Sequence, residues 1–402
     1  MTEDNPSETS SMREERLARR DWILLPLISL LTVCLLAGSV EWIGRRMFPS
    51  SDTGGENCMV FNDPSTGARG IPNCVCWEKI PEGQLTQYRF NGSGYRDNRE
   101  LGPKTPGSYR IVMLGTSMAA GFRVAQDQSF AALLPEELSR RTGRRIELYN
   151  ESLPWRSPHT IAVHFDDALA ARPDMILWIL TPIDIGMTSW VLPTHEDDGS
   201  LTFVAKAWHK TRAAFAKGSL AAATAEIFRH TRTATLLSDL LYKSRSQYVK
   251  SSLMSGDYEK DFLKAESSVE WQTQLKTFDN DAANMEERAK NAGITFVAVL
   301  LPDRTQAAMV SMMGEWPKGY DPFKLDNELR SIIVRHGGSY VDVLPDFVTI
   351  PNPHWGFFPI DGHPNAEGHA TITRLLANAL TDGAVPALRA GTQPQAKLEQ
   401  TK

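Results

Sequence analysis

Short apolar runs alternate with stretches of helical periodicity between residues 110 and 380. The apolar runs cover residues 110–114, 146–149, 175–180, 295–301 and 340–344. Apolar residues recur at helical spacing over 128–142, 161–171, 281–292, 324–336 and 368–380. The first pattern is typical of buried strands and the second of amphipathic helices. Their alternation predicts an α/β fold, a flavodoxin-like three-layer α/β/α arrangement around a mostly parallel five-stranded sheet.

Ligands of such sheets bind beyond the carboxyl ends of the strands. A site is therefore expected among the residues that follow Leu114, Tyr149, Leu180, Leu301 and Leu344. Residues 200–290 contain Ala-rich and charged stretches, and strand-like runs are lacking up to 290. We expect them to form a helical insertion that serves as a lid or a partner surface, because insertions at this edge commonly shape specificity.

A long apolar segment lies near the N-terminus. Residues 22–40 carry no charge, and nineteen apolar or small residues just span a hydrocarbon core of about 30 Å. Arginines flank it on both sides, with the larger number before it: Arg13, Arg16, Arg19 and Arg20, then Arg45 and Arg46. This bias favours a single-pass anchor over 22–44 in the inner (cytoplasmic) membrane, with the main domain facing the periplasm or exterior. The alternative is a cleaved signal peptide, for which Ala37-Gly38-Ser39 has small residues at a suitable spacing.

Composition divides the chain into five expected segments. They are a cytoplasmic tail (1–21), the transmembrane anchor (22–44), an irregular Cys-containing stalk (45–108), the α/β domain with its insertion (109–382) and a disordered tail (383–402). The stalk is dense in Gly, Pro and Asn, and the final tail is rich in Gln, Lys and Thr. Such compositions favour irregular and frayed structure.

Cysteine is confined to the N-terminal part of the chain: Cys34 in the apolar segment, then Cys58, Cys74 and Cys76. In an oxidising compartment Cys58 would pair with Cys74 or with Cys76, which leaves one thiol over. A metal site of these three cysteines lacks the second Cys-x-x-Cys or the His ligands that structural zinc prefers, so no metal is expected.

The 402 residues carry a net charge of -5 and are 42% hydrophobic, which suits one large domain with an accessory segment. The slightly acidic balance and the absence of a long basic run exclude a dominant nucleic-acid surface. No nucleotide-binding signature occurs, and no cofactor is implied. Trp155, Trp178, Trp190 and Trp355 lie near the segments of interest, either as packing residues or as the lining of a sugar site.

A serine follows the first expected strand, within the segment GTSMAAG over residues 115–121. A Ser at a strand-to-helix turn has an exposed hydroxyl, and nearby backbone N–H groups favour a developing oxyanion. Gly115 and Gly121 permit a tight turn. Ser117 is therefore a candidate nucleophile; the plainer interpretation is a helix cap.

A candidate base and its orienting acid lie just before the last expected helix, in DGHPNAEGH over residues 361–369. A nucleophilic serine needs a base, and the base needs a carboxylate. Asp361 and His363 can form that couple, and activity is expected to fall when His363 is protonated. A turn capped by Asn365 is the alternative. A metal site of His354, His363 and His369 is disfavoured, because a spacing of six does not put the last two on one helix face.

Together these motifs resemble the SGNH (GDSL-like) hydrolase superfamily, in its membrane-anchored bacterial form. VMLGTSMAAGF is similar to the first block, with Thr116 in place of the Asp of Gly-Asp-Ser, and DGHPNAEGH to the last block, Asp-x-His. Residues 88–96 (YRFNGSGYR) and 302–306 (PDRTQ) resemble two further segments of those members. The resemblance covers residues 85–382 and implies a catalytic triad of Ser117, His363 and Asp361.

Two blocks depart from the family pattern. Where the second block has Asn-x-Gly, with the Gly N–H in the oxyanion hole, this chain has Asn150-Glu-Ser152. Where the third block has Asn-Asp, this chain has Ile183-Asp184, and Ile183 cannot donate a hydrogen bond. The resemblance implies oxyanion or binding roles for Gly115 and Ser152, with Asn150 as a substitute donor or as a residue that ties the turn. Losing one oxyanion donor costs about 10²–10³ in rate.

The expected function is serine-dependent hydrolysis or transfer of an acyl ester. The resemblance implies an acylated small molecule or an acetylated extracytoplasmic glycan as substrate, and envelope or polysaccharide-machinery proteins as partners. The alternative is a catalytically impaired protein that binds glycan or assembles an envelope complex. The replaced oxyanion residues favour this alternative, and the intact triad residues favour catalysis.

Overall fold

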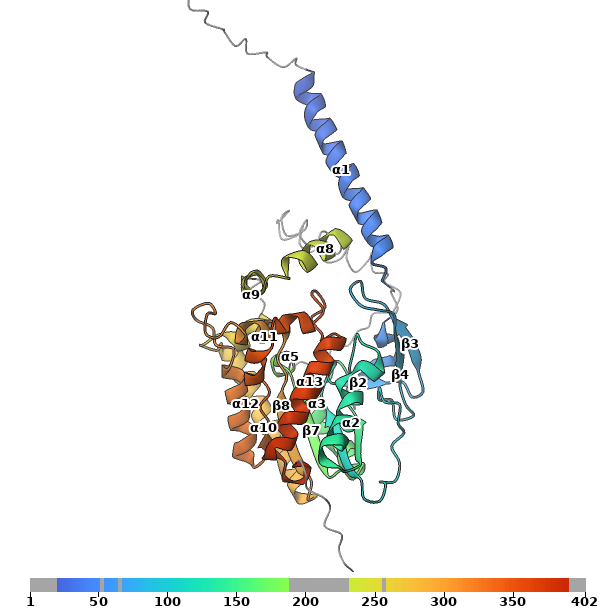
Figure 1. The fold of residues 1–402 in the computed structure, drawn as a ribbon, viewed down its shortest axis with the longest axis vertical. Helices are drawn as coiled ribbons and strands as arrows, with labels where there is room; N and C mark the ends of the chain where they lie inside the picture. The colour runs from blue at the N-terminus through green and yellow to red at the C-terminus, as the bar shows by residue number, and fades with distance from the viewer. Residues whose placement is uncertain (1–19, 51–53, 64–66, 188–230, 255–257, 390–402) are drawn as a thin grey trace, which may run out of the picture.

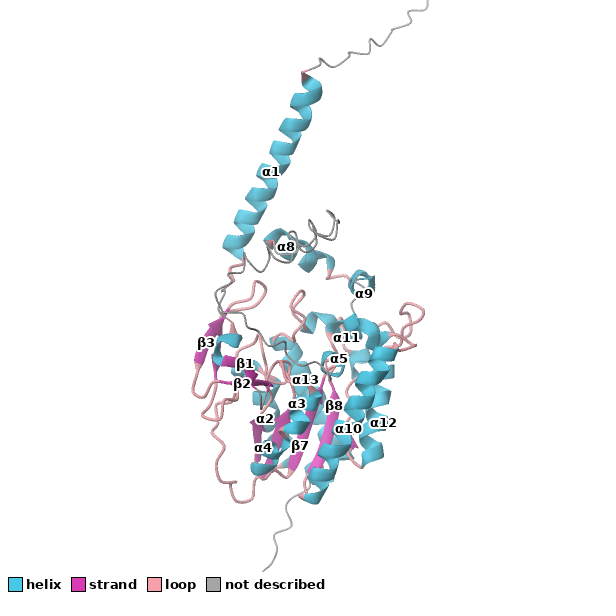
Figure 2. Ribbon diagram, turned by 180° about the vertical axis from the view of Figure 1, so that it is seen from behind, coloured by secondary structure: helices cyan, strands magenta, loops and turns pink. Residues whose placement is uncertain are grey.

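The computed structural model describes residues 20–50, 54–63, 67–187, 231–254 and 258–389. Its centre is a five-stranded sheet with the order β6-β5-β7-β8-β9 (Figures 1 and 2). The strands are β5 (Tyr109–Leu114), β6 (Ile146–Asn150), β7 (Met175–Leu180), β8 (Thr295–Leu300) and β9 (Ser339–Tyr340). Every pairing within this sheet is parallel. Counted along the chain this is the order 2-1-3-4-5 of flavodoxin-like sheets, so the predicted fold is confirmed.

Helices cover both faces of the sheet. One face packs on α2 (Phe130–Thr142) and α13 (Ala366–Ala379), and its core includes Ile111, Leu177 and Val299. The other packs on α3 (Pro158–Val163), α4 (Phe165–Ala170), α10 (Val269–Asn291) and α12 (Lys324–His336), and its core includes Val112, Trp178 and Phe296. Neighbouring strand residues point to opposite faces, so fully buried strands such as β5 and β7 supply both cores.

Helix starts follow capping residues. Ser129, Ser268 and Asn365 each accept a backbone N–H three residues on, at the N-termini of α2, α10 and α13. The predicted bounds of α12 match the structure, and Gly337 ends it in the left-handed conformation. Helix α10 begins at Val269, well before the predicted residue 281, because the Ser268 cap and buried Trp271 extend it. Strand β9 has two residues, shorter than predicted.

Residues 54–108 are more regular than the expected irregular stalk. They contain the antiparallel pairs β1 (Met59–Asp63) with β2 (Gly67–Gly70), and β3 (Val75–Glu78) with β4 (Thr86–Arg89). A disulfide joins Cys58 to Cys74, while Cys76 is free. Strands this short show little alternation in sequence, and packing on the main domain through Tyr88 and Phe122 fixes them instead.

Helix α1 (Asp21–Met47) contains the apolar segment and projects from the body of the protein (Figure 1). Residues 22–47 are long and apolar enough to cross a membrane, by length and composition. Trp22 and Trp42 are both exposed near its ends. Twenty residues separate them, which at 1.5 Å per residue is about 30 Å, the thickness of a hydrocarbon core.

The described part of the predicted insertion is helical, as expected. It contains α8 (Arg232–Leu241), α9 (Arg245–Met254), η3 (Tyr258–Leu263) and the start of α10. Residues 188–230, and with them Trp190, lie outside the described residues, as do most of the predicted N- and C-terminal tails. The shorter elements are η1 (Gly55–Cys58), η2 (Gln126–Gln128), α5 (Pro182–Gly186), α11 (Arg304–Val310), η4 (Pro345–Thr349), η5 (Pro353–Gly356), η6 (Leu380–Ala384) and η7 (Pro386–Leu388).

Candidate active site

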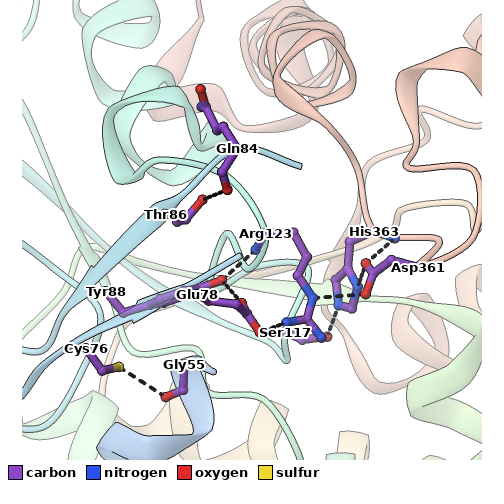
Figure 3. Close-up of polar contacts among 10 residues, drawn as sticks. All are labelled: Gly55, Cys76, Glu78, Gln84, Thr86, Tyr88, Ser117, Arg123, Asp361 and His363. Atoms are coloured by element: carbon purple, nitrogen blue, oxygen red, sulfur yellow. Dashed lines mark hydrogen bonds and ion pairs between the residues drawn. The ribbon is translucent and has the colours of Figure 1, made fainter. Parts of the chain in front are cut away.

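The carboxyl-end edge of the sheet brings Ser117, His363 and Asp361 together, although 246 residues separate the first two (Figure 3). The Ser117 Oγ lies 2.8 Å from His363 Nε2, and His363 Nδ1 lies 2.6 Å from Asp361 Oδ1. The hydroxyl, imidazole and carboxylate thus form one continuous chain of hydrogen bonds. This is the arrangement in which imidazole removes a serine proton and a carboxylate holds the ring in the required tautomer.

The turn that carries Ser117 follows β5 directly. A side chain at Gly115 would come within 2.6 Å of Ala119 Cβ and 2.9 Å of the Ile179 carbonyl, so only glycine fits there. The Ala120 N–H donates to the Thr116 carbonyl and the Phe122 N–H to the Ser117 carbonyl, which closes the turn. Ser117 is half-buried at this turn and does not cap a regular helix.

The side chain of Arg96 stabilises the same turn through hydrogen bonds to its backbone. Its guanidinium is buried and donates to the backbone carbonyls of Ala120, Gly121 and Val124. It also stacks on Tyr88, with Cζ 4.2 Å from the ring centroid. Arg96 ends the YRFNGSGYR segment, so the structure gives this sequence motif a physical role. It fixes the backbone just after the nucleophile.

The predicted donor Asn150 is the last residue of β6 and Ser152 lies in the turn after it, and both are engaged within the protein. The Asn150 side-chain amide donates to the Ala119 carbonyl at 3.0 Å, and the Ser152 N–H donates to Asn150 Oδ1 at 3.1 Å. Asn150 therefore ties the β6 turn to the nucleophile turn. An oxyanion role for either group requires these bonds to open and stays a prediction. Among the residues that the structure describes, no acceptor lies on the Ser117 N–H, which is available to an oxyanion.

Ile183 and Asp184 follow β7 and face opposite ways. Ile183 is 44% exposed, whereas Asp184 is buried and accepts hydrogen bonds from Thr116 Oγ1 at 2.7 Å and the Thr181 N–H at 2.8 Å. Burial raises the pKa of Asp184 to about 6, against the hydrogen bonds from the two threonines. Asp184 thus anchors the residue before the nucleophile.

The candidate catalytic loop, residues 357–365 with Asp361 and His363, is held by its own backbone. Phe357 pairs with Pro364, and the Phe358 N–H donates to the His363 carbonyl at 2.8 Å. Gly362 has φ +84°, a conformation that a side chain would strain, so Gly between Asp361 and His363 lets the two side chains converge. Asn365 caps α13, as the alternative interpretation of this motif as a capped turn predicts. The helix cap and the contact of Asp361 with His363 are therefore both present in the same loop.

Sequence reasoning missed Arg123. Its Nε donates to Asp361 Oδ2 at 2.9 Å, and its Nη1 forms a short ion pair with Glu78 on β3 (Figure 3). The Tyr88 hydroxyl on β4 donates to Glu78 Oε2 at 2.6 Å and accepts the Arg123 N–H at 2.8 Å. Arg123 has φ +73°, a left-handed conformation that the sequence does not predict for an arginine. The hairpin of β3 and β4 is therefore linked to the triad.

Glu82, in the turn of that hairpin, makes a second link. Its Oε1 accepts the N–H groups of Asp361 at 2.8 Å and Ile360 at 3.1 Å. Burial raises the pKa of Glu82, and the two N–H groups oppose this. The backbone of Asp361 is thus held by Glu82 of the expected stalk, and its side chain by Arg123, which is itself paired with Glu78 of the same segment.

Asp361 is ionised in this environment. Burial alone would raise its pKa, but the hydrogen bond and charge of His363 and the charge of Arg123 outweigh burial and lower the pKa to about 2. A carboxylate that stays charged across the physiological range is what the orienting acid of a triad requires.

A cavity of about 420 Å³ lies beside the candidate catalytic loop. Its walls come from the end of α8 and the residues just after it, from the start of α11, and from the segment around His363: Asp239, Tyr242, Lys243, Arg304, Trp355, Phe357, Pro359 and Asn365. Arg304, from the PDRTQ segment, donates to the carbonyls of Tyr242, His354 and Pro359, and so joins the two walls. Trp355 lines the cavity, whereas Trp178 stacks on Phe278 in the core and Trp155 is exposed.

The structure does not bring the three histidines of the metal alternative together as a ligand set. In the described ranges no group of three His, Cys, Asp or Glu side chains is placed to hold a metal ion. His369 is fully buried; burial lowers its pKa to about 3, and its Nδ1 accepts the Phe130 N–H at 3.2 Å. His369 is a packing residue of α13.

No family model and no curated protein matches the chain in sequence. Solved structures of similar fold include an acetyl-xylooligosaccharide esterase from Geobacillus Stearmophilus (10% identity, 68% of this chain, 95% of that chain, TM-score 0.36). A lipase/acylhydrolase from Enterococcus faecalis has 10% identity, covers 68% and 95%, and has a TM-score of 0.35. A GDSL-like lipase from Bacteroides thetaiotaomicron has 10% identity, covers 70% and 92%, and has a TM-score of 0.33. The function proposed below therefore rests on the geometry of the site.

Proposed function

We propose that this protein is a serine-dependent acyl-ester hydrolase or O-acyltransferase that acts through Ser117, His363 and Asp361. The observation that carries the proposal is the unbroken chain of hydrogen bonds from Ser117 Oγ through the imidazole to a carboxylate held ionised. A serine that only caps a helix or packs in the core has no need of this arrangement.

In the proposed reaction, Ser117 Oγ attacks the ester carbonyl carbon while His363 Nε2 takes the hydroxyl proton. The tetrahedral oxyanion accepts a hydrogen bond from the Ser117 N–H. As it collapses, the bond to the leaving alcohol breaks, and His363 gives its proton to that alcohol. Water or a sugar hydroxyl then loses a proton to His363 and attacks the acyl-enzyme. The bond from the acyl carbon to Ser117 Oγ breaks, and His363 returns the proton to Oγ. Hydrolysis and transfer differ only in this last acceptor.

An acetylated extracytoplasmic glycan is the proposed substrate class, with the chain attached to the membrane by α1. Trp355 and Tyr242 offer aromatic faces, and Asp239, Lys243 and Asn365 offer polar groups, in the cavity beside the catalytic loop. Aromatic faces with a few polar groups suit a sugar ring. Envelope or polysaccharide-machinery proteins are proposed as partners on the basis of the sequence resemblance alone.

The test is release of p-nitrophenol from p-nitrophenyl acetate by the full chain, with Ser117→Ala and His363→Ala beside it. Loss of activity in both variants supports the proposal; equal rates in all three chains would refute it. Adding acetylated and unmodified oligosaccharides then separates the two reactions. Hydrolysis frees acetate from the first, whereas transfer moves acetyl groups to the second.

The second candidate is a binding or assembly protein that has lost catalysis. It is favoured by the exposed Ile183 and by the engagement of the Ser152 N–H and the Asn150 amide within the protein. An inactive chain that still binds an acetylated glycan, with binding lost on Trp355→Ala, would favour this function.

A further inference from the structure

Helix α8 carries an exposed apolar face with no partner among the described residues. Leu237, Leu240 and Leu241 are 45%, 64% and 53% exposed. With Thr233 they follow the spacing i, i+4, i+7 and i+8, which puts all four on one side of the helix. Three exposed leucines on one face of a ten-residue helix are a candidate docking surface.

The same face binds α1. The Thr233 N–H and hydroxyl both contact Glu41 Oε2, at 3.1 and 3.3 Å. Gly44 lets the two helices touch, because a Cβ there would lie 2.8 Å from Arg232 Cβ. The leucine face of α8 is therefore continuous with its contact on the helix that has the length and composition to cross a membrane.

The height of this contact matches the surface of a bilayer. Glu41 is the first charged residue after the apolar stretch, and Gly44 lies four residues beyond Val40. Four residues of helix rise about 6 Å, and each headgroup layer is about 5–8 Å thick. Trp42, exposed beside Glu41, is a residue type enriched at that level. Both ribbon views show α8 beside the lower end of α1, on the side of the body from which α1 projects (Figures 1 and 2).

Charges around the helix suit an acidic headgroup layer. Arg45 and Lys243 are well exposed, and Arg46 is exposed on the same turn of α1. Glu41 is partly neutralised by Arg45 at 2.8 Å, and Asp239 by Lys243 at 3.8 Å. Basic side chains beside a membrane helix are attracted to anionic lipids.

We infer that α8 is a membrane-surface helix whose leucine face, Leu237, Leu240 and Leu241, inserts into the bilayer beside α1. Interfacial helices bury such faces about 5–10 Å into the boundary of headgroups and acyl chains. The opposite side of α8 carries Asp239, which lines the cavity beside the catalytic loop. Docking of α8 therefore holds the carboxyl-end edge of the sheet toward the membrane surface. This inference does not depend on the proposed chemistry.

The test uses the full chain in vesicles of phosphatidylcholine with a minor fraction of phosphatidylglycerol. In a background of Cys34→Ser and Cys76→Ser, the environment-sensitive dye NBD is attached at Leu240→Cys. The matched control is Val334→Cys, an exposed apolar position near the end of α12, which leads to the amino end of β9. We expect the dye at 240 to emit at shorter wavelength and to be quenched by nitroxide-labelled lipid chains, with neither effect at 334.

A dye at 240 that stays fully hydrated would overturn the inference. So would a blue shift without quenching by lipid, because the leucines would then pack on protein. Leu237→Asn with Leu241→Asn in the chain labelled at 240 is a second check. These exposed changes leave the folded domain intact, and the lipid quenching is expected to be lost. Retention of quenching would contradict the role of the leucine face.

Discussion

Arg123 Nε donates a hydrogen bond to Asp361 Oδ2 at 2.9 Å, on the carboxylate oxygen that His363 does not use. The same guanidinium is paired with Glu78 on β3. A residue of the nucleophile turn thus connects the orienting acid of the triad to the N-terminal hairpin. Arg123 is a positioning residue in this account, because it acts on the proposed chemistry through Asp361.

Replacing Arg123 is expected to slow the reaction and to change its pH dependence. Arg123→Gln should lower kcat by about ten- to hundredfold with little change in KM, short of the roughly 10⁴-fold loss that follows when a triad acid is disabled. Because the Arg123 charge lies beside the hydrogen-bonded Asp361–His363 pair and disfavours its protonation, the variant should lose activity at a higher pH on the acid side. Arg123→Lys should recover part of the rate. An unchanged kcat–pH profile would contradict this role, and Arg89→Gln, exposed on β4, is the control.

Restoring an oxyanion donor should speed the reaction. Ile183 is exposed just after β7, where the family resemblance implies an asparagine amide. Ile183→Asn is expected to raise kcat by about tenfold or more, since one donor is worth about 10²–10³ in rate when well placed. Ile183→Leu, which adds no donor, should leave kcat unchanged. Equal kcat values for the two variants would show that a missing amide does not limit the rate.

The disulfide should support the site from a distance. Cys58 and Cys74 are 16 residues apart, and their disulfide tethers the start of β3. A disulfide that closes a loop of this size raises the free energy of unfolding by about 3 kcal/mol. Cys58→Ser with Cys74→Ser should loosen the hairpin that carries Glu78 and so lower both activity and protection of its amides from hydrogen exchange. Cys76→Ser keeps the disulfide and is the control. Normal activity in the double variant would mean that the hairpin holds Asp361 without its tether.

Asp184 should make stability depend on pH. Its pKa is raised to about 6 in the folded state, so between about pH 4 and about pH 6 the folded protein holds a proton that the unfolded chain releases. Its contribution to the free energy of unfolding therefore falls as pH rises through this window. Asp184→Asn should gain stability relative to the wild type over the same interval, as measured by urea unfolding. A constant difference across the window would show that Asp184 does not titrate as described.

Much of the fold was predictable because local patterns and packing agree. The strand β7 and the helix α12 have the predicted bounds, since their apolar spacing and their ends coincide. The bounds of β9 and the pairs of β1 to β4 were not predicted, because strands of two to five residues depend on neighbours far along the chain.

In the candidate site, too, some residues were predictable from the sequence and others were not. Ser117, Asp361 and His363 were identified because each lies in a short motif at a strand end or before a helix. Arg123 and Glu78 were not, because their partners are 238 and 45 residues away in sequence and no motif links them. The hydrogen bond from the Ser152 N–H to Asn150 Oδ1 was not predicted either, because it depends on the geometry of the turn after β6.

The most direct test of the central claim is labelling of the full chain with a fluorophosphonate, which reacts with activated serines, at about pH 8, where an imidazole base is neutral. The wild type should be labelled at Ser117, as identified by peptide mass spectrometry. Labelling should vanish in Ser117→Ala and His363→Ala and persist in Ser331→Ala, an exposed serine on α12. A folded wild type that takes no label, or a label that survives His363→Ala, would contradict a working triad and favour the binding protein instead.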